Sequence, residues 1–171
     1  IYIHLKNLGL EKNWDSKENM YLKYRLVVFT VERALERMRM IHPNVYQFNF
    51  LIDCEGCPLS LSFAREAKDL FLQLGEYHVE RLNASILVNC SWTISMVWSM
   101  VSYFLPEILV KRYNLFTKPA TDPEVQKLIR SIIDPKANGG SLLKYFGGPV
   151  EDPFEYQKML KWDQLKRSIA E

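Results

Sequence analysis

The 171-residue chain lacks several features that define common protein classes. Its three cysteines are too few for a disulfide scaffold, and an odd number of cysteines fits a reducing compartment, so we expect the cytosol. Its net charge is +2 and no block of basic residues stands out, so nothing requires nucleic acid as a partner. Repeats and low-complexity segments are absent. One globular domain is the economical expectation.

Common catalytic motifs are also missing. The sequence has no G-x-S-x-G turn, and its three histidines show no spacing that links one of them to a serine or a carboxylate. The Gly139-Gly140 and Gly147-Gly148 pairs lack the pattern and the lysine of a phosphate loop, so turns are the better interpretation. The sequence therefore does not favour a hydrolase.

A metal centre is not expected either. A closed zinc site needs four ligands, and the candidates are scattered without a second close pair: Cys90, His4, His42 and His78. Asp53, at the end of a predicted strand, is positioned to act as a catalytic acid or a metal ligand. Such a residue more often caps a turn.

The most specific local motif is Cys54-x-x-Cys57, between a predicted strand and a predicted helix, where redox pairs of the thioredoxin type also lie. No aromatic residue precedes Cys54 in the usual way, and Pro58 follows the second cysteine. The alternative is that two small residues share a turn. A redox function stays open as a minor hypothesis.

The most conspicuous stretch that is present, residues 84–106, contains no charged residue. Its first part is a β-prone run typical of a buried strand, and residues 93–104 have helical spacing. Several serines and asparagines dilute the stretch, and Pro106-Glu107 follows without a basic flank, which argues against a membrane span. The stretch predicts a strand that turns directly into an apolar helix.

The same alternation extends along the chain. Strands are predicted over residues 1–5, 48–53, 85–89 and 113–116, and helices over residues 15–41, 63–74, 93–104, 106–112, from 123 and from 152 to about 169. Strands that alternate with helices predict an α/β fold with a largely parallel sheet. The chain starts at Ile1 without a methionine, so we expect it to be cut from a longer protein.

Aromatic residues gather in and beside the uncharged helix, namely Trp92, Trp98, Tyr103 and Phe104. They form either an ordinary core or the wall of an apolar cavity for a hydrophobic ligand. Sequence pattern does not separate these alternatives.

An ordered set of short motifs resembles the CRAL-TRIO lipid-binding domain family, which includes the yeast phosphatidylinositol/phosphatidylcholine transfer protein. The set comprises Phe50-Leu51-Ile52-Asp53 with Gly56, Glu80-Arg81-Leu82, Ile86-Leu87-Val88-Asn89 with Trp92, Phe104-Leu105-Pro106, and Leu142 with Phe146-Gly147-Gly148. The chain departs from the family at Ser91 and Leu143, where prolines are usual, and in its two paired cysteines.

The resemblance implies a mixed, largely parallel sheet that floors a hydrophobic pocket, with helices packed on it and a mobile helical gate. The gate corresponds to about residues 106–113, with Glu107, Ile108, Leu109 and Lys111 as its residues. The family's N-terminal helical lobe is absent from this chain. Residues 1–153 are then the lipid-binding lobe, and residues 154–171 form a C-terminal surface helix.

The resemblance also implies site residues. Glu80 and Arg112 match the headgroup-binding glutamate and gate lysine of phosphoinositide-handling members, and the predicted pocket residues are Phe48, Phe50, Ile86, Val88, Trp92, Val97, Val101 and Phe104. Phe48 and Phe50 stand where phosphatidylcholine-binding members carry small hydroxyl residues, so choline lipids are less expected than phosphatidylinositol.

The expected function is non-enzymatic binding, and transfer or presentation, of such a lipid at a membrane surface. A protein partner is a further expectation, and no cofactor beyond the lipid is expected. The alternatives are a protein-interaction module with a collapsed pocket and the redox protein described above.

Overall fold

The computed structural model describes residues 1–5, 17–41, 43–57, 68, 72, 80–133 and 142–151. The chain divides into two compact units, Ile1–Ile132 and Ile133–Glu171. Most of the helix predicted at 63–74, the surface helix predicted at 154–171, His42 and His78 lie outside the described residues. The predicted domain boundary at residue 153 therefore stays a prediction.

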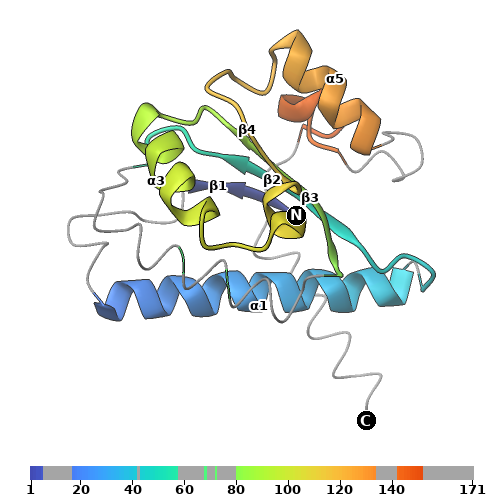
Figure 1. Cartoon of the computed structure of the whole chain (residues 1–171). Coiled ribbons are helices and arrows are strands. Elements are labelled where there is room, and N and C mark those ends of the chain that lie inside the picture. The colour runs from blue at the N-terminus through green and yellow to red at the C-terminus, as the bar shows by residue number, and fades with distance from the viewer. Residues whose placement is uncertain are drawn as a thin grey trace. The chain divides into compact units, whose positions relative to one another are not determined.

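The first unit is built on a four-stranded parallel sheet in the order β1 (Tyr2–His4), β2 (Phe48–Asp53), β3 (Leu82–Val88) and β4 (Tyr113–Leu115). Parallel neighbours need a crossover connection, which agrees with the long segments between the strands. Figure 1 shows the strands side by side with α1 running along the sheet. The predicted α/β fold with a parallel sheet is confirmed.

The described residues of this unit include the helices α1 (Lys17–Ile41), α3 (Trp92–Ser102), α4 (Glu107–Val110) and α5 (Pro123–Ile132). The hydroxyl of Ser91 caps α3 by accepting a hydrogen bond from the backbone N–H of Ile94 at 3.3 Å. Only three residues, 89–91, separate the end of β3 from the start of α3. The predicted strand-to-helix unit is thus confirmed. Within the described parts of the chain, no helix combines the length and apolar character needed to cross a bilayer.

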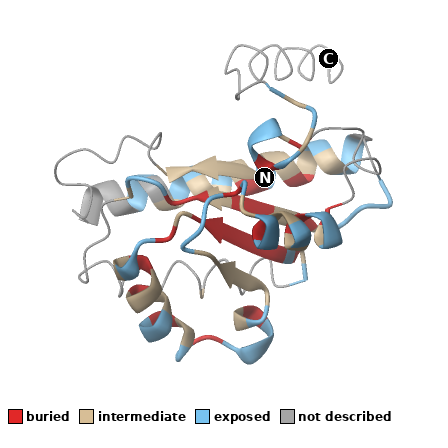
Figure 2. Ribbon diagram, turned by 90° about the horizontal axis from the view of Figure 1, so that it is seen from above, coloured by how far each residue is buried: buried red, intermediate tan, exposed pale blue. Residues whose placement is uncertain are grey.

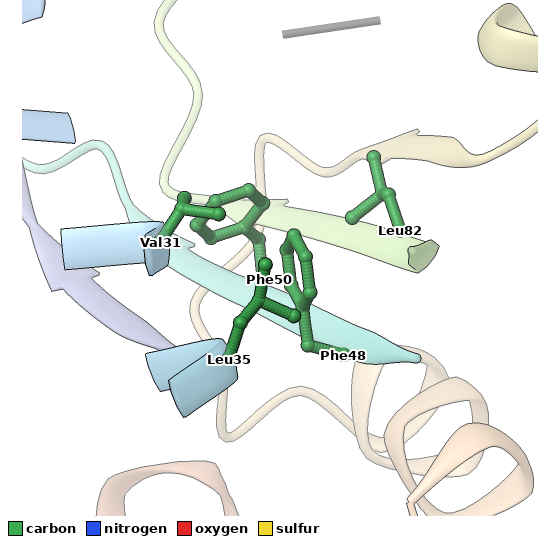
Figure 3. Close-up of a cluster of buried hydrophobic side chains, with 5 residues drawn as sticks. All are labelled: Val31, Leu35, Phe48, Phe50 and Leu82. Atoms are coloured by element: carbon green, nitrogen blue, oxygen red, sulfur yellow. The ribbon is translucent and has the colours of Figure 1, made fainter. Parts of the chain in front are cut away.

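One face of the sheet packs against α1. Val31 and Leu35 of this helix lie against Phe48, Phe50 and Leu82 of the two central strands, as Figure 3 shows. All five side chains are buried, and burying a side chain of this size contributes about 1.5–3 kcal/mol. Figure 2 shows that the central strands are more buried than the rest of the sheet. The core of this unit therefore lies between α1 and the central strands.

The register of β3 decides which of its side chains join that core. Phe48 is paired with Leu82 but Asn49 with Ala84, so Asn83 is an extra residue that forms a β-bulge. After the bulge, Phe50 is level with Ser85, and Leu51 is level with Ile86. Because side chains alternate between the two faces of a strand, Ile86 and Val88 project away from the face that carries Phe50.

The described part of the second unit, residues 142–151, is a closed loop around a short 3-10 helix, η2 (Lys144–Phe146). Leu143 and Val150 form a bridge, and Phe146 is completely buried. A side chain on Gly148 would place its Cβ 2.0 Å from the carbonyl oxygen of Leu142, so this position requires glycine. The sequence analysis did not predict η2.

Candidate functional site

The face that α1 covers carries a row of three side chains across the sheet. Phe50, Ser85 and Tyr113 are level with one another in β2, β3 and β4. Ser85 is completely buried, and its hydroxyl has no hydrogen-bond partner among the described residues. A buried polar group without a partner costs about 1–3 kcal/mol, so this hydroxyl is unusual in an otherwise apolar row.

Helix α3 contacts the same face. The rings of Trp98 and Tyr113 have centroids 4.8 Å apart, and Ile94 packs in a cluster with Leu87 of β3. Burial raises the pKa of the Tyr113 phenol, so this side chain stays neutral in the folded protein. The face is thus an apolar floor, defined by Phe50, Ser85, Leu87 and Tyr113, with α1 and α3 packed on it.

A polar edge borders this floor where β3 and β4 begin. Arg112 comes directly before β4, and its Nη1 atom donates a hydrogen bond to the carbonyl oxygen of Leu82, the first residue of β3. Glu80 stands two residues before Leu82 and is exposed, whereas Arg112 is half-buried. Parallel strands begin at the same edge of a sheet, so Glu80 and Arg112 belong to one corner of the molecule.

Amide side chains add to this edge. The Nδ2 atom of Asn83 donates to Oδ1 of Asn49 at 2.9 Å, and Nε2 of Gln47 donates to the carbonyl oxygen of Glu80 at 3.2 Å. These residues were missed by the sequence analysis. Asn83 lies beside Asn49 because β2 pairs with β3, and pairing between strands this far apart in the sequence is not signalled by a local pattern.

The comparisons with known proteins agree with this geometry. The family model described as CRAL/TRIO domain matches residues 2–140. The chain belongs to the CRAL-TRIO family. Domains of this family bind lipids or other small hydrophobic molecules. The predicted family membership is confirmed.

Solved structures support the same fold. The crystal structure of Sfh5, a yeast CRAL-TRIO protein, matches 94% of this chain with a TM-score of 0.58 and 17% sequence identity. The match covers 57% of that chain, so this CRAL-TRIO chain spans little more than half the length of Sfh5. The search of curated proteins found no match.

The structure separates the predicted pocket residues of this CRAL-TRIO domain into groups. Phe48 and Phe50 lie on the apolar floor, and Val97 and Val101 are buried in α3 in a second cluster with Leu105. Ile86 and Val88 are buried on the opposite face of the sheet. Trp92 and Phe104 are 75% and 56% exposed. Trp92 is the first residue of α3, Phe104 follows its end, and neither belongs to the buried stripe of the helix, which consists of Ile94, Val97 and Val101.

The predicted gate segment contains the single-turn helix α4. Leu109 is buried, and Ile108 is exposed, so only one side of the turn packs against the domain. Nζ of Lys111 lies 2.6 Å from Oε1 of Glu107 in an exposed ion pair, which contributes little to stability. A group of exposed apolar side chains lies at and beyond the end of α3, consisting of Met100, Tyr103, Phe104 and Ile108. We call it the apolar gate surface.

The cysteines are arranged differently from the expected Cys54-x-x-Cys57 pair. The Sγ atom of Cys54 lies 3.9 Å from Sγ of Cys90, and both are buried, whereas Cys57 is half-buried. The Cys90 thiol and burial raise the pKa of Cys54. A raised thiol pKa disfavours the thiolate that redox catalysis requires, so the structure offers the redox hypothesis no support.

Proposed function

We propose that this CRAL-TRIO domain binds phosphatidylinositol without catalysing a reaction and transfers or presents it at membrane surfaces. The observation that carries the proposal is the direct junction between an apolar floor and a polar edge. Tyr113 belongs to the floor, and its neighbour Arg112 belongs to the edge that includes Glu80. A phospholipid likewise consists of apolar acyl chains joined to a polar headgroup, so its two parts match the floor and the edge.

The chemistry of the edge favours an inositol phosphate headgroup. The guanidinium of Arg112 carries five N–H donors, one of which donates to Leu82, and a pair of N–H donors on such a group can bind a phosphate as a fork. The carboxylate of Glu80 accepts hydrogen bonds from hydroxyl groups such as those of inositol. The acyl chains would be held by apolar burial, at about 25 cal/mol per Å². Choline offers no hydroxyl to Glu80, so phosphatidylcholine is a poorer fit.

Exchange of the lipid requires contact with a bilayer. The apolar gate surface combines the exposed aromatic side chains of Tyr103 and Phe104 with Met100 and Ile108. Such side chains favour the boundary between water and lipid. We expect a cytosolic protein that associates reversibly with membranes through this surface, and we expect α4 to move when the lipid enters.

Lipid transfer between liposomes tests the proposal. The wild-type chain is expected to move phosphatidylinositol from donor to acceptor liposomes and to release it on extraction. Glu80→Gln and Arg112→Ala are expected to lower phosphatidylinositol transfer at least about tenfold, because each removes a charge-assisted contact. The controls Glu32→Gln and Arg130→Ala change exposed residues of α1 and α5 and are expected to leave transfer unchanged.

A second candidate is an interaction module with no ligand. It is favoured by the direct packing of Val31 and Leu35 on Phe48 and Phe50, which fills this part of the floor with side chains. Under this alternative, native mass spectrometry finds no lipid, and liposomes donate none to the protein. Co-purified or captured phosphatidylinositol excludes it.

A further inference from the structure

The geometry points to a divalent-cation site formed by His4, Asp53 and Glu55, suited to zinc. This site is separate from the lipid site. His4 and Asp53 end β1 and β2 at the carboxyl edge of the sheet, whereas Glu80 and Arg112 lie at the amino edge. The sequence analysis weighed zinc for cysteines and histidines and considered Asp53 as a metal ligand by itself. It did not connect Asp53 with His4 or Glu55, because these residues meet only in the folded sheet.

The three side chains converge. One ligand atom from each lies within 4.8 Å of the other two. Parallel pairing places His4 level with Asp53, and the turn after β2 returns Glu55 to the same point. The residues therefore come together through the register of two strands and one tight turn, both of which are fixed by backbone hydrogen bonds.

The spacing of the histidine and the aspartate fits two metal ligands as well as an ion pair. Nε2 of His4 lies 3.4 Å from Oδ2 of Asp53, which exceeds the usual N–H···O range of about 2.7–3.2 Å. Two ligands bound tetrahedrally at zinc distances of about 2.0–2.1 Å are about 3.3 Å apart. The other ring nitrogen of His4, Nδ1, is buried, and no described residue forms a hydrogen bond with it.

The aspartate is held in position by a second set of contacts. Its Oδ1 atom accepts hydrogen bonds from Nδ2 of Asn89 and from the backbone N–H of Glu55, each at 2.9 Å. Asp53 is only 1% exposed, and Asn89 has a positive φ of 54°. These contacts occupy one carboxylate oxygen and leave Oδ2 directed at His4. Orienting contacts of this kind commonly surround metal ligands.

The ligand types select the ion. One imidazole with two carboxylates suits zinc or another first-row divalent metal, whereas magnesium and calcium prefer oxygen ligands alone. Three protein ligands leave one position of a tetrahedral ion for water. A bound ion would tie the ends of β1 and β2 to the turn at Glu55 and offset the charge of a buried carboxylate.

Metal binding to the full chain tests the site. After treatment with a chelator, the wild-type protein is expected to bind one Zn²⁺ per chain in equilibrium dialysis. Glu55→Gln and His4→Gln are each expected to weaken binding at least about tenfold, since even changes behind the ligands cost about 10–100-fold. Glu32→Gln, which changes an exposed glutamate on α1, is expected to bind Zn²⁺ as the wild type does.

Cobalt distinguishes these ligands from the nearby cysteines. The Co²⁺-loaded protein is expected to show visible d–d absorption without a strong thiolate charge-transfer band, and Cys57→Ser is expected to leave the spectrum unchanged. Glu55 is exposed, so Glu55→Gln is expected to unfold at the wild-type temperature when metal is absent. Failure to bind one Zn²⁺, unchanged affinity in both ligand variants, or a thiolate band would overturn the proposal.

Discussion

Phe50 and Ile86 occupy neighbouring strands, yet their side chains project to opposite faces of the sheet. Phe50 is level with Ser85, so the residue that faces it across the floor is a buried serine rather than the isoleucine next in sequence. Phe50 packs against α1, while Ile86 is buried on the other face. The register of β2 and β3 thus places some side chains on the face that borders the candidate lipid site. It places the others on the opposite face, where they stabilise the sheet.

Phe50 and Trp92, both predicted from sequence as pocket residues, are expected to differ in their effect on stability. Phe50→Ala should lower the free energy of unfolding by about 3–5 kcal/mol, because it removes a buried ring from the α1 interface. Trp92→Ala should change it by less than about 1 kcal/mol, because this side chain is 75% exposed. Urea denaturation measures both values, and equal losses would contradict the described packing.

Substitution of Ser85 tests whether its hydroxyl contacts the lipid, because such a contact would make lipid retention fall without a loss of protein stability. Ser85→Ala removes a buried hydroxyl that has no partner, so the free energy of unfolding is expected to stay constant or rise. If this hydroxyl instead binds a polar atom of the lipid, the same variant should retain phosphatidylinositol several-fold less well. Ser99→Ala, at an exposed position of α3, is the matched control. Unchanged lipid retention in Ser85→Ala would exclude this contact.

Tyr113 is expected to contribute to unfolding at alkaline pH. Burial raises its pKa in the folded state above the usual value of about 10, so the folded state holds the phenol proton more tightly than the unfolded state does. The resulting stability is present below about pH 10 and is lost as the pH rises beyond it. Tyr113→Phe should reduce this loss in urea titrations between pH 9 and about pH 11. An identical pH dependence in both proteins would refute the assignment.

The three cysteines should react with a thiol reagent at different rates. Cys57 is half-buried, whereas Cys54 and Cys90 are buried beside each other, so one thiol is expected to react first and two only after unfolding. Cys57→Ser should remove the early reaction. Rapid reaction of two thiols in the folded protein would show that the buried pair is accessible.

Much of the fold could be predicted from the sequence, because hydrophobic period and turn residues act locally. The strand at Phe48–Asp53 and the change from β3 to α3 both follow from such patterns. The face of the sheet to which each side chain projects was much less predictable. One extra residue at Asn83 reverses the phase of β3, and a bulge depends on pairing between distant strands rather than on local sequence.

Of the two candidate sites, one could be predicted from the sequence and the other could not. The resemblance to the family selected Glu80 and Arg112, and the structure places both at the edge where β3 and β4 begin. Their headgroup role stays a prediction. The closeness of His4 and Asp53 depends on the register between β1 and β2, which connects residues 49 positions apart. No spacing in the sequence signals such a contact.

The most direct test of the central claim is native mass spectrometry of the purified chain after incubation with liposomes that contain equal amounts of phosphatidylinositol and phosphatidylcholine. We expect one phosphatidylinositol molecule per wild-type chain and its loss in the double variant Glu80→Gln, Arg112→Ala. Lipid-free protein, or equal uptake of both lipids by the wild type and the double variant, would contradict the proposed function.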